Sequence, residues 1–135
     1  MQSQRAANQY RQAQNHGMVA AASPTRLVQV MFEQILAQLA TAHGCMGRIK
    51  NNLPLQEVVS KGKSLNKAIR LIDQLNATLD MERGGQVAQN LRNLYLYMLE
   101  RLTFANINND SATVTEVASL VAKIKAGWDR IVVDN

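Results

Sequence analysis

Three short breaks in a long helical pattern constrain the fold of this sequence more than any other feature. They lie near 51–54, 83–85 and 108–110, and each contains asparagine, proline or glycine residues that favour turns. Between the breaks, apolar residues recur at helical spacing and predict four helices of roughly 20 to 28 residues. Connections this short place consecutive helices side by side and antiparallel. The sequence therefore predicts an all-α, antiparallel, up-down-up-down four-helix bundle.

Residues at the expected helix ends sharpen this prediction. Ser23 can cap the first helix with its hydroxyl, and Pro24 follows at a position where the helix needs no amide donor. The pair Gly84-Gly85 precedes the third helix, and we expect Gly84 to adopt a left-handed cap conformation. The expected helices span about 24–50, 55–82, 86–107 and 111–132.

Two tyrosines of the third helix are predicted to face different sides. Tyr95 and Tyr97 are two residues apart, which on a helix is about 200°, so one packed face cannot hold both. Tyr95 falls on the core stripe, whereas Tyr97 shares another side with Phe104. The residues that we expect to be buried together are Leu94, Tyr95, Met98, Leu102, Leu120, Ile124 and Trp128. The apolar residues that we expect to bind a partner instead are Leu96, Tyr97, Leu99, Phe104 and Ile107.

The first 22 residues differ in composition from the rest of the chain. They are rich in glutamine, asparagine and alanine, with little helical periodicity. We therefore divide the chain into a flexible N-terminal segment, 1–22, and a bundle domain, 23–135. Tyr10, Met18 and Val19 are apolar side chains of this segment, and we interpret them as a removable cover for an apolar groove. A plain flexible tail is the alternative.

The net charge of +5 raises the possibility of nucleic-acid binding. Basic residues are scattered along the chain, but Lys63, Lys67 and Arg70 share one face of the second helix. A solvated helix face explains this group better than a phosphate track does, because no aromatic side chains for base stacking are interleaved with it. A nucleic-acid-binding helical module that uses this face is nevertheless kept as the alternative function.

Residue patterns for catalysis or metal binding are absent from the sequence. No glutamate is followed three residues later by a histidine, as a di-iron site in a helical bundle requires, and the CxxCH motif of covalent haem is missing. His43 is interpreted as structural. Cys45 is the single cysteine, which excludes an internal disulfide and is typical of a reduced, cytoplasmic protein. We expect no catalysis, no metal and no other cofactor.

Membrane insertion and classical secretion are not expected either. No apolar run reaches about 18 residues, the length that a transmembrane helix needs. The N-terminus also lacks a charged region followed by a hydrophobic stretch. The expected localisation is the cytoplasm.

Several motifs, taken together and in order, carry a resemblance to a known family. They are AASPTRLVQVMFEQIL (21–36), LDMERGGQVAQNLRNLYLYMLERL (79–102) and ANINND (105–110), followed by Trp128. The chain resembles the flagellar secretion chaperones called FliS over about residues 20–131. It departs from the family at 31–33, where Met-Phe-Glu stands in place of a frequent Leu-Tyr-Asp.

This resemblance implies a four-helix chaperone of the bacterial cytoplasm rather than an enzyme. Such chaperones bind the C-terminal segment of flagellin, which is disordered in the monomer, and prevent premature polymerisation before export. The resemblance also implies contacts with the cytoplasmic domain of the export gate and with an anti-sigma factor. Neither nucleic acid nor a membrane is an expected partner.

Overall fold

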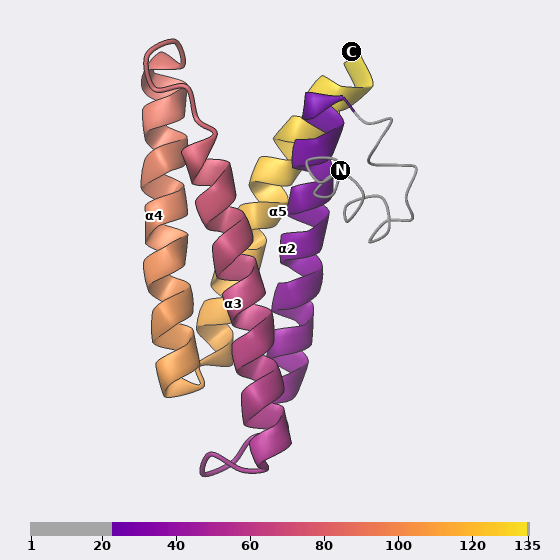
Figure 1. The fold of residues 1–135 in the computed structure, drawn as a ribbon, viewed down its shortest axis with the longest axis vertical. Coiled ribbons are helices and arrows are strands. Elements are labelled where there is room, and N and C mark those ends of the chain that lie inside the picture. Colours follow the sequence, from indigo (N-terminus) through magenta and orange to yellow (C-terminus); the bar gives the residue numbers. More distant parts are fainter. Residues whose placement is uncertain (1–22, 135) are drawn as a thin grey trace, which may run out of the picture.

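A computed structural model of the chain describes residues 23–134, with side chains up to Val132 (Figure 1). It contains four helices, α2 (Pro24–Met46), α3 (Leu55–Ala77), α4 (Gly85–Asn108) and α5 (Ser111–Asp134). Each helix packs against two others: α2 and α4 both contact α3 and α5. The predicted all-α, antiparallel four-helix bundle is confirmed. The predicted N-terminal segment and its cover residues Tyr10, Met18 and Val19 lie outside the described residues.

The first two helices end earlier than the sequence predicted. Ser23 caps α2 as expected, because its Oγ accepts a hydrogen bond of 3.2 Å from the amide of Arg26. Helix α2 stops at Met46 instead of near 50, and a turn with positive φ at Asn51 and Asn52 leads into α3. Helix α3 stops at Ala77 instead of near 82.

The two glycines before α4 have different roles, and our assignment between them was wrong. Gly84 has φ of −79°, whereas Gly85 has φ of +54° and takes the left-handed conformation. Gly84 is needed for space instead. A Cβ atom at Gly84 would lie 2.4 Å from Cβ of Ala88 and 2.8 Å from the carbonyl oxygen of Asp80. The first glycine therefore permits close packing and the second permits the turn.

Three of the seven residues that were expected to be buried together are fully buried. Tyr95, Met98 and Leu102 are buried, with exposed fractions of 4% or less. The other members are only partly buried and pack against the edge of the core: Leu94, Leu120, Ile124 and Trp128. Residues that complete the buried core include Phe32, Ile35, Leu39, Leu65, Ile72, Val114, Val117 and Val121.

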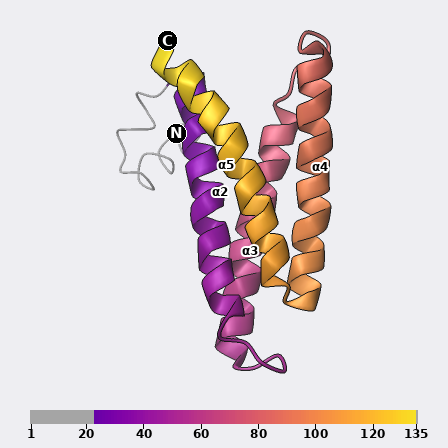
Figure 2. The ribbon, with the colours of Figure 1, turned by 180° about the vertical axis from the view of Figure 1, so that it is seen from behind.

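The helix arrangement explains this partial burial. Figures 1 and 2 show α4 and α5 close together where the short connection joins them and diverging toward the start of α4. Met98 and Leu102 lie in the closely packed half of α4 and are fully buried. Leu94 in α4 and Ile124 in α5 lie farther from the connection, and each keeps partial access to solvent.

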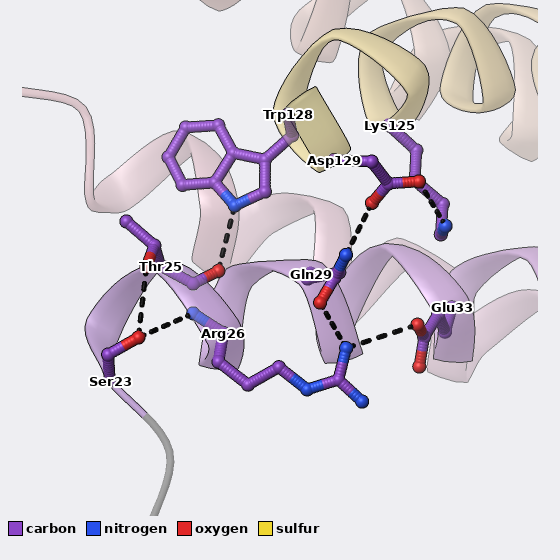
Figure 3. Close-up of polar contacts among 8 residues, drawn as sticks. All are labelled: Ser23, Thr25, Arg26, Gln29, Glu33, Lys125, Trp128 and Asp129. Carbon is purple, nitrogen blue, oxygen red and sulfur yellow. Dashed lines mark hydrogen bonds and ion pairs between the residues drawn. The ribbon is translucent and has the colours of Figure 1, made fainter. Parts of the chain in front are cut away.

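The diverging half of α5 is attached to the start of α2 (Figure 3). The indole N–H of Trp128 donates a hydrogen bond of 2.8 Å to the carbonyl oxygen of Thr25. The Gln29 amide donates to Asp129 Oδ1 at 2.6 Å, and Lys125 Nζ lies 2.7 Å from Asp129 Oδ2. The pKa of the Asp129 carboxyl is lowered, mainly by the hydrogen bond from Lys125 and then by the one from Gln29. The contacts of Trp128 and Asp129 with Thr25 and Gln29 hold this half of α5 against α2.

Candidate functional site

The side of α4 that points away from the core is unusually apolar. Leu96, Tyr97 and Phe104 are 43%, 39% and 40% exposed, and Ile107 is 77% exposed. These are four of the five residues that the sequence predicted to bind a partner. The fifth, Leu99, is partly buried and packs against the core. Four of the five residues therefore form an exposed apolar surface with Leu99 at its inner edge, and partner binding there stays a prediction.

The four exposed side chains form two ridges along α4. Tyr97 and Phe104 are seven residues apart and share one ridge, while Leu96 and Ile107 are eleven residues apart and share another. The ridges are roughly 80° apart around the helix, and the Leu96 ridge lies between Tyr97 and the inner edge at Leu99. We call the two together the α4 ridges.

The Tyr97 ridge is held in place by polar groups of α4 and α5. The Tyr97 hydroxyl donates a hydrogen bond of 2.5 Å to Oε2 of Glu116 in α5. Arg101 Nη2 donates to Thr113 Oγ1 at 3.2 Å, and its guanidinium carbon lies 4.7 Å from the centre of the Phe104 ring, in cation–π range. Both aromatic rings of this ridge therefore have a fixed neighbour.

Glu116 connects these contacts. Its Oε1 lies 3.6 Å from Arg101 Nε, which is within ion-pair range but too long for a hydrogen bond. That buried Nε–H has no hydrogen-bond acceptor in the described part of the chain. The carboxylate also raises the pKa of Tyr97, because it accepts the phenolic hydrogen bond. Glu116 thus orients Tyr97 while leaving much of its ring exposed.

Sequence reasoning missed Arg101 and Glu116. Arg101 stands four residues after Tyr97 and three before Phe104, so helical spacing alone could have placed it on their ridge. Glu116 offers no such signal, because its contact with Tyr97 depends on how α4 and α5 pack.

The end of α4 is anchored by a buried lysine. Lys61 of α3 is 4% exposed, and its Nζ donates a hydrogen bond of 2.9 Å to the carbonyl oxygen of Asn106 and lies 3.5 Å from Asn109 Oδ1. Asn109 in turn donates to the carbonyl oxygen of Met46 at 3.4 Å. Burial lowers the pKa of Lys61. This clamp positions the last turn of α4, which carries Ile107.

Lys61 therefore does not belong to the solvated basic face of α3. The three residues of the alternative nucleic-acid face, Lys63, Lys67 and Arg70, are all exposed. Lys67 and Arg70 line a hollow between α3 and α2, whereas α4 packs on another side of α3. The α4 ridges and this basic face are consequently separate surfaces.

Features of a metal centre or a reactive thiol are missing from the described residues. No three side chains among histidine, cysteine, aspartate and glutamate come together there as a metal-binding group. Burial, with Glu57 as a second cause, raises the pKa of the Cys45 thiol and so disfavours the thiolate. No described helix combines the length and the apolar character that a membrane-spanning segment needs.

Comparison with known proteins adds direct evidence on the family. The model of the family described as Flagellar protein FliS matches residues 6–135. The flagellar secretion chaperone FliSB of Pseudomonas aeruginosa is 40% identical over 131 residues, covering 97% of this chain and 98% of its own. Flagellar secretion chaperones FliS of Salmonella typhimurium and Vibrio cholerae are 38% and 33% identical, over 90% of this chain and 86% and 85% of theirs.

Proposed function

The chain belongs to the FliS family and acts as a flagellar secretion chaperone, and we propose that its client is the disordered C-terminal segment of flagellin. We further propose that the client binds to the α4 ridges in the bacterial cytoplasm and is thereby kept from polymerising before it reaches the export apparatus. The observation that carries this proposal is the exposure of Leu96, Tyr97, Phe104 and Ile107 on one helix.

The physical argument starts from the cost of ordering the client. A disordered segment loses conformational entropy when it folds on its receptor, so it must bury apolar surface to bind. An amphipathic helix can do so by placing its apolar face against the two α4 ridges. Ile107 is 77% exposed, so most of its side chain is available for such a contact.

Tyr97 is the residue best suited to anchor the client. Aromatic side chains bury a large area while losing few rotamers, and they are enriched among residues that dominate binding energy. The hydrogen bond to Glu116 fixes the ring before the client arrives. Part of the ordering cost is therefore already met in the free chaperone.

We propose that binding is not coupled to catalysis, to a cofactor or to a nucleotide. The export-gate cytoplasmic domain and an anti-sigma factor are proposed as further partners, because the family resemblance implies them. ATP hydrolysis that survives rigorous purification and co-elutes with the protein would contradict the non-enzymatic part of this proposal.

Calorimetric titration with a C-terminal flagellin peptide from the same organism tests the client. We expect saturable binding that weakens little as salt is raised, because apolar contacts dominate. Single-stranded and duplex DNA form the comparison arm, since binding through phosphates weakens steeply with salt. DNA binding without flagellin binding would favour the alternative module based on Lys63, Lys67 and Arg70.

A matched pair of variants tests the surface. Tyr97→Phe keeps the ring and loses only the hydroxyl, whereas Tyr97→Ala removes the ring. If the ring is the anchor, Tyr97→Phe, which loses only the ordering by Glu116, binds slightly less tightly than the native chain, and Tyr97→Ala binds much less tightly. Equal binding by all three proteins would place the client elsewhere on the bundle.

A further inference from the structure

A second surface, on another side of α3, has a chemistry that the α4 ridges lack. It is a shallow hollow of about 310 Å³ between α2 and α3. Helix α2 contributes Gln34 and Gln38 to its wall, and α3 contributes Lys67, Arg70, Leu71 and Gln74. We call this the glutamine–cation hollow.

The hollow holds two positive charges and no negative one. No ion pair or side-chain hydrogen bond is formed by Lys67 or Arg70 within residues 23–134. The nearest acidic residues in sequence are Glu33, which pairs with Arg26 at 3.5 Å, and Asp73, which is exposed and forms no ion pair with Arg70. The two positive charges of the hollow therefore favour the binding of an anion.

The three glutamines restrict which anion fits. Their side-chain amides also form no hydrogen bond within the described part of the chain, so each offers a free carbonyl acceptor beside its two N–H donors. Peptide N–H groups can use these acceptors, whereas a phosphodiester backbone has no donor to give them. No aromatic side chain lines the hollow, so base stacking has no platform.

We propose that the glutamine–cation hollow binds an acidic peptide segment of a partner protein. Lys67 and Arg70 are one helical turn apart, which places them about 5–6 Å from each other at Cβ and matches two carboxylates spaced one turn apart on a partner helix. The partly buried Leu71, which packs against the core, gives the segment an apolar contact beside them. Because α4 packs on another side of α3, this partner and the client can be bound at the same time.

The probe for this proposal is a short alanine-rich helical peptide with glutamates at i and i+4. The same peptide with glutamine in place of glutamate is the chemical control, and a single-stranded DNA of similar length is the phosphate arm. The full chain, labelled with ¹⁵N, is titrated with each probe and the amide shifts are followed. We expect the acidic peptide to shift the amides around Gln34, Gln38, Lys67, Arg70 and Gln74.

Variants then test the charges. Lys67→Gln/Arg70→Gln removes both cations of the hollow. Lys123→Gln/Arg130→Gln makes the same change in net charge on exposed residues of α5. We expect the first variant to weaken acidic-peptide binding by about tenfold or more and the second by less than about twofold.

Four outcomes would overturn the proposal. They are an absence of binding by the acidic peptide, equal binding by the glutamine peptide, equal losses in the two variants, and tighter binding of DNA that is lost in the hollow variant alone. The last would make the hollow a nucleic-acid site. Unchanged thermal melts of both variants ensure that a loss reflects the surface rather than folding.

Discussion

Tyr95 and Tyr97 are separated by one residue and have opposite environments. Tyr95 is 4% exposed within the core, while Tyr97 is 39% exposed and its hydroxyl donates a hydrogen bond to Glu116 of α5. Tyr95→Ala should therefore lower the free energy of unfolding by about 3 kcal/mol or more and leave client binding by the folded fraction intact. Tyr97→Ala should barely change stability but weaken flagellin-peptide binding by about 1–3 kcal/mol.

Thermal melts and peptide titrations of both variants give a two-by-two comparison. If Tyr97→Ala lowers the melting temperature as much as Tyr95→Ala and binds normally when folded, both tyrosines are structural. The client surface must then be sought on another helix.

Alkaline pH supplies a second test at Tyr95. Burial raises the pKa of its hydroxyl from 10.0 to about 12, because the charged phenolate is disfavoured in the core. The unfolded chain thus loses this proton at lower pH than the folded chain. The contribution to stability is complete below pH 10 and is lost as pH rises toward 12.

Denaturant unfolding at a series of pH values measures this effect as a difference. The native chain is compared with Tyr95→Phe, which lacks only this hydroxyl, so that the contributions of all other groups are common to both proteins. We expect the stability of the native chain to fall more steeply than that of Tyr95→Phe above pH 10. Parallel curves would show that Tyr95 ionises as freely as an exposed tyrosine.

The two tyrosines also show what a sequence can reveal about single residues. Helical periodicity is enough to assign Tyr95 to the core, because burial follows the angle around one helix. The partner of Tyr97 cannot be found in this way. Glu116 is 19 residues away on another helix, and its contact depends on the relative position of α4 and α5.

At the scale of the helices, the burial of each leucine sets the cost of truncating it. Leu102 is fully buried in the closely packed half, so Leu102→Ala should cost about 2–5 kcal/mol. Leu94 and Leu120 are partly buried, so Leu94→Ala and Leu120→Ala should fall at or below the lower end of that range. Denaturant midpoints of the three variants give the order. Equal losses in Leu102→Ala and Leu94→Ala would mean that the bundle is closed along its whole length in solution.

The two glycines before α4 allow steric crowding and backbone conformation to be tested separately. Asparagine tolerates the left-handed region better than alanine does, so Gly85→Asn should be more stable than Gly85→Ala. The order should reverse at Gly84, where the larger side chain meets Ala88 and Asp80, and Gly84→Ala itself should cost about 1–3 kcal/mol. Thermal melts of the four variants check both orders. A preference for asparagine at Gly84 would contradict the close packing found there.

The number and order of the helices could be predicted from the sequence, but the residues at which they end and the divergence of α5 from α4 could not. Breakers such as Pro54 and Gly85 mark the connections in the sequence, which settles the number and direction of the helices. The end of α3 at Ala77 depends on Thr78, whose hydroxyl donates a hydrogen bond of 2.7 Å to the carbonyl oxygen of Leu75. The divergence of α5 depends on contacts 100 residues apart, such as Gln29 with Asp129, which no local pattern encodes.

For the molecule as a whole, the position of Ser23 bears on the proposed cover. The described chain begins there, at the end of the bundle where α5 also ends and from which the start of α4 diverges (Figure 2). Tyr10 precedes Ser23 by 13 residues, and an extended chain of that length spans about 40 Å. Tyr97 stands 12 residues after the start of α4, about 18 Å along the helix axis, so the segment is long enough to reach this end of the α4 ridges.

Deleting residues 1–17 tests whether the segment covers the client surface. If it competes with the client, the truncated chain should keep its thermal melt and bind the flagellin peptide more tightly, because no internal ligand has to be displaced. The variant Tyr10→Ser keeps the full length and should reproduce part of the gain, since it weakens the apolar contact alone. An affinity that is the same in all three proteins would identify a plain tail. Loss of the cooperative melt on deletion would contradict both interpretations, because residues before Ser23 would then be part of the folded bundle.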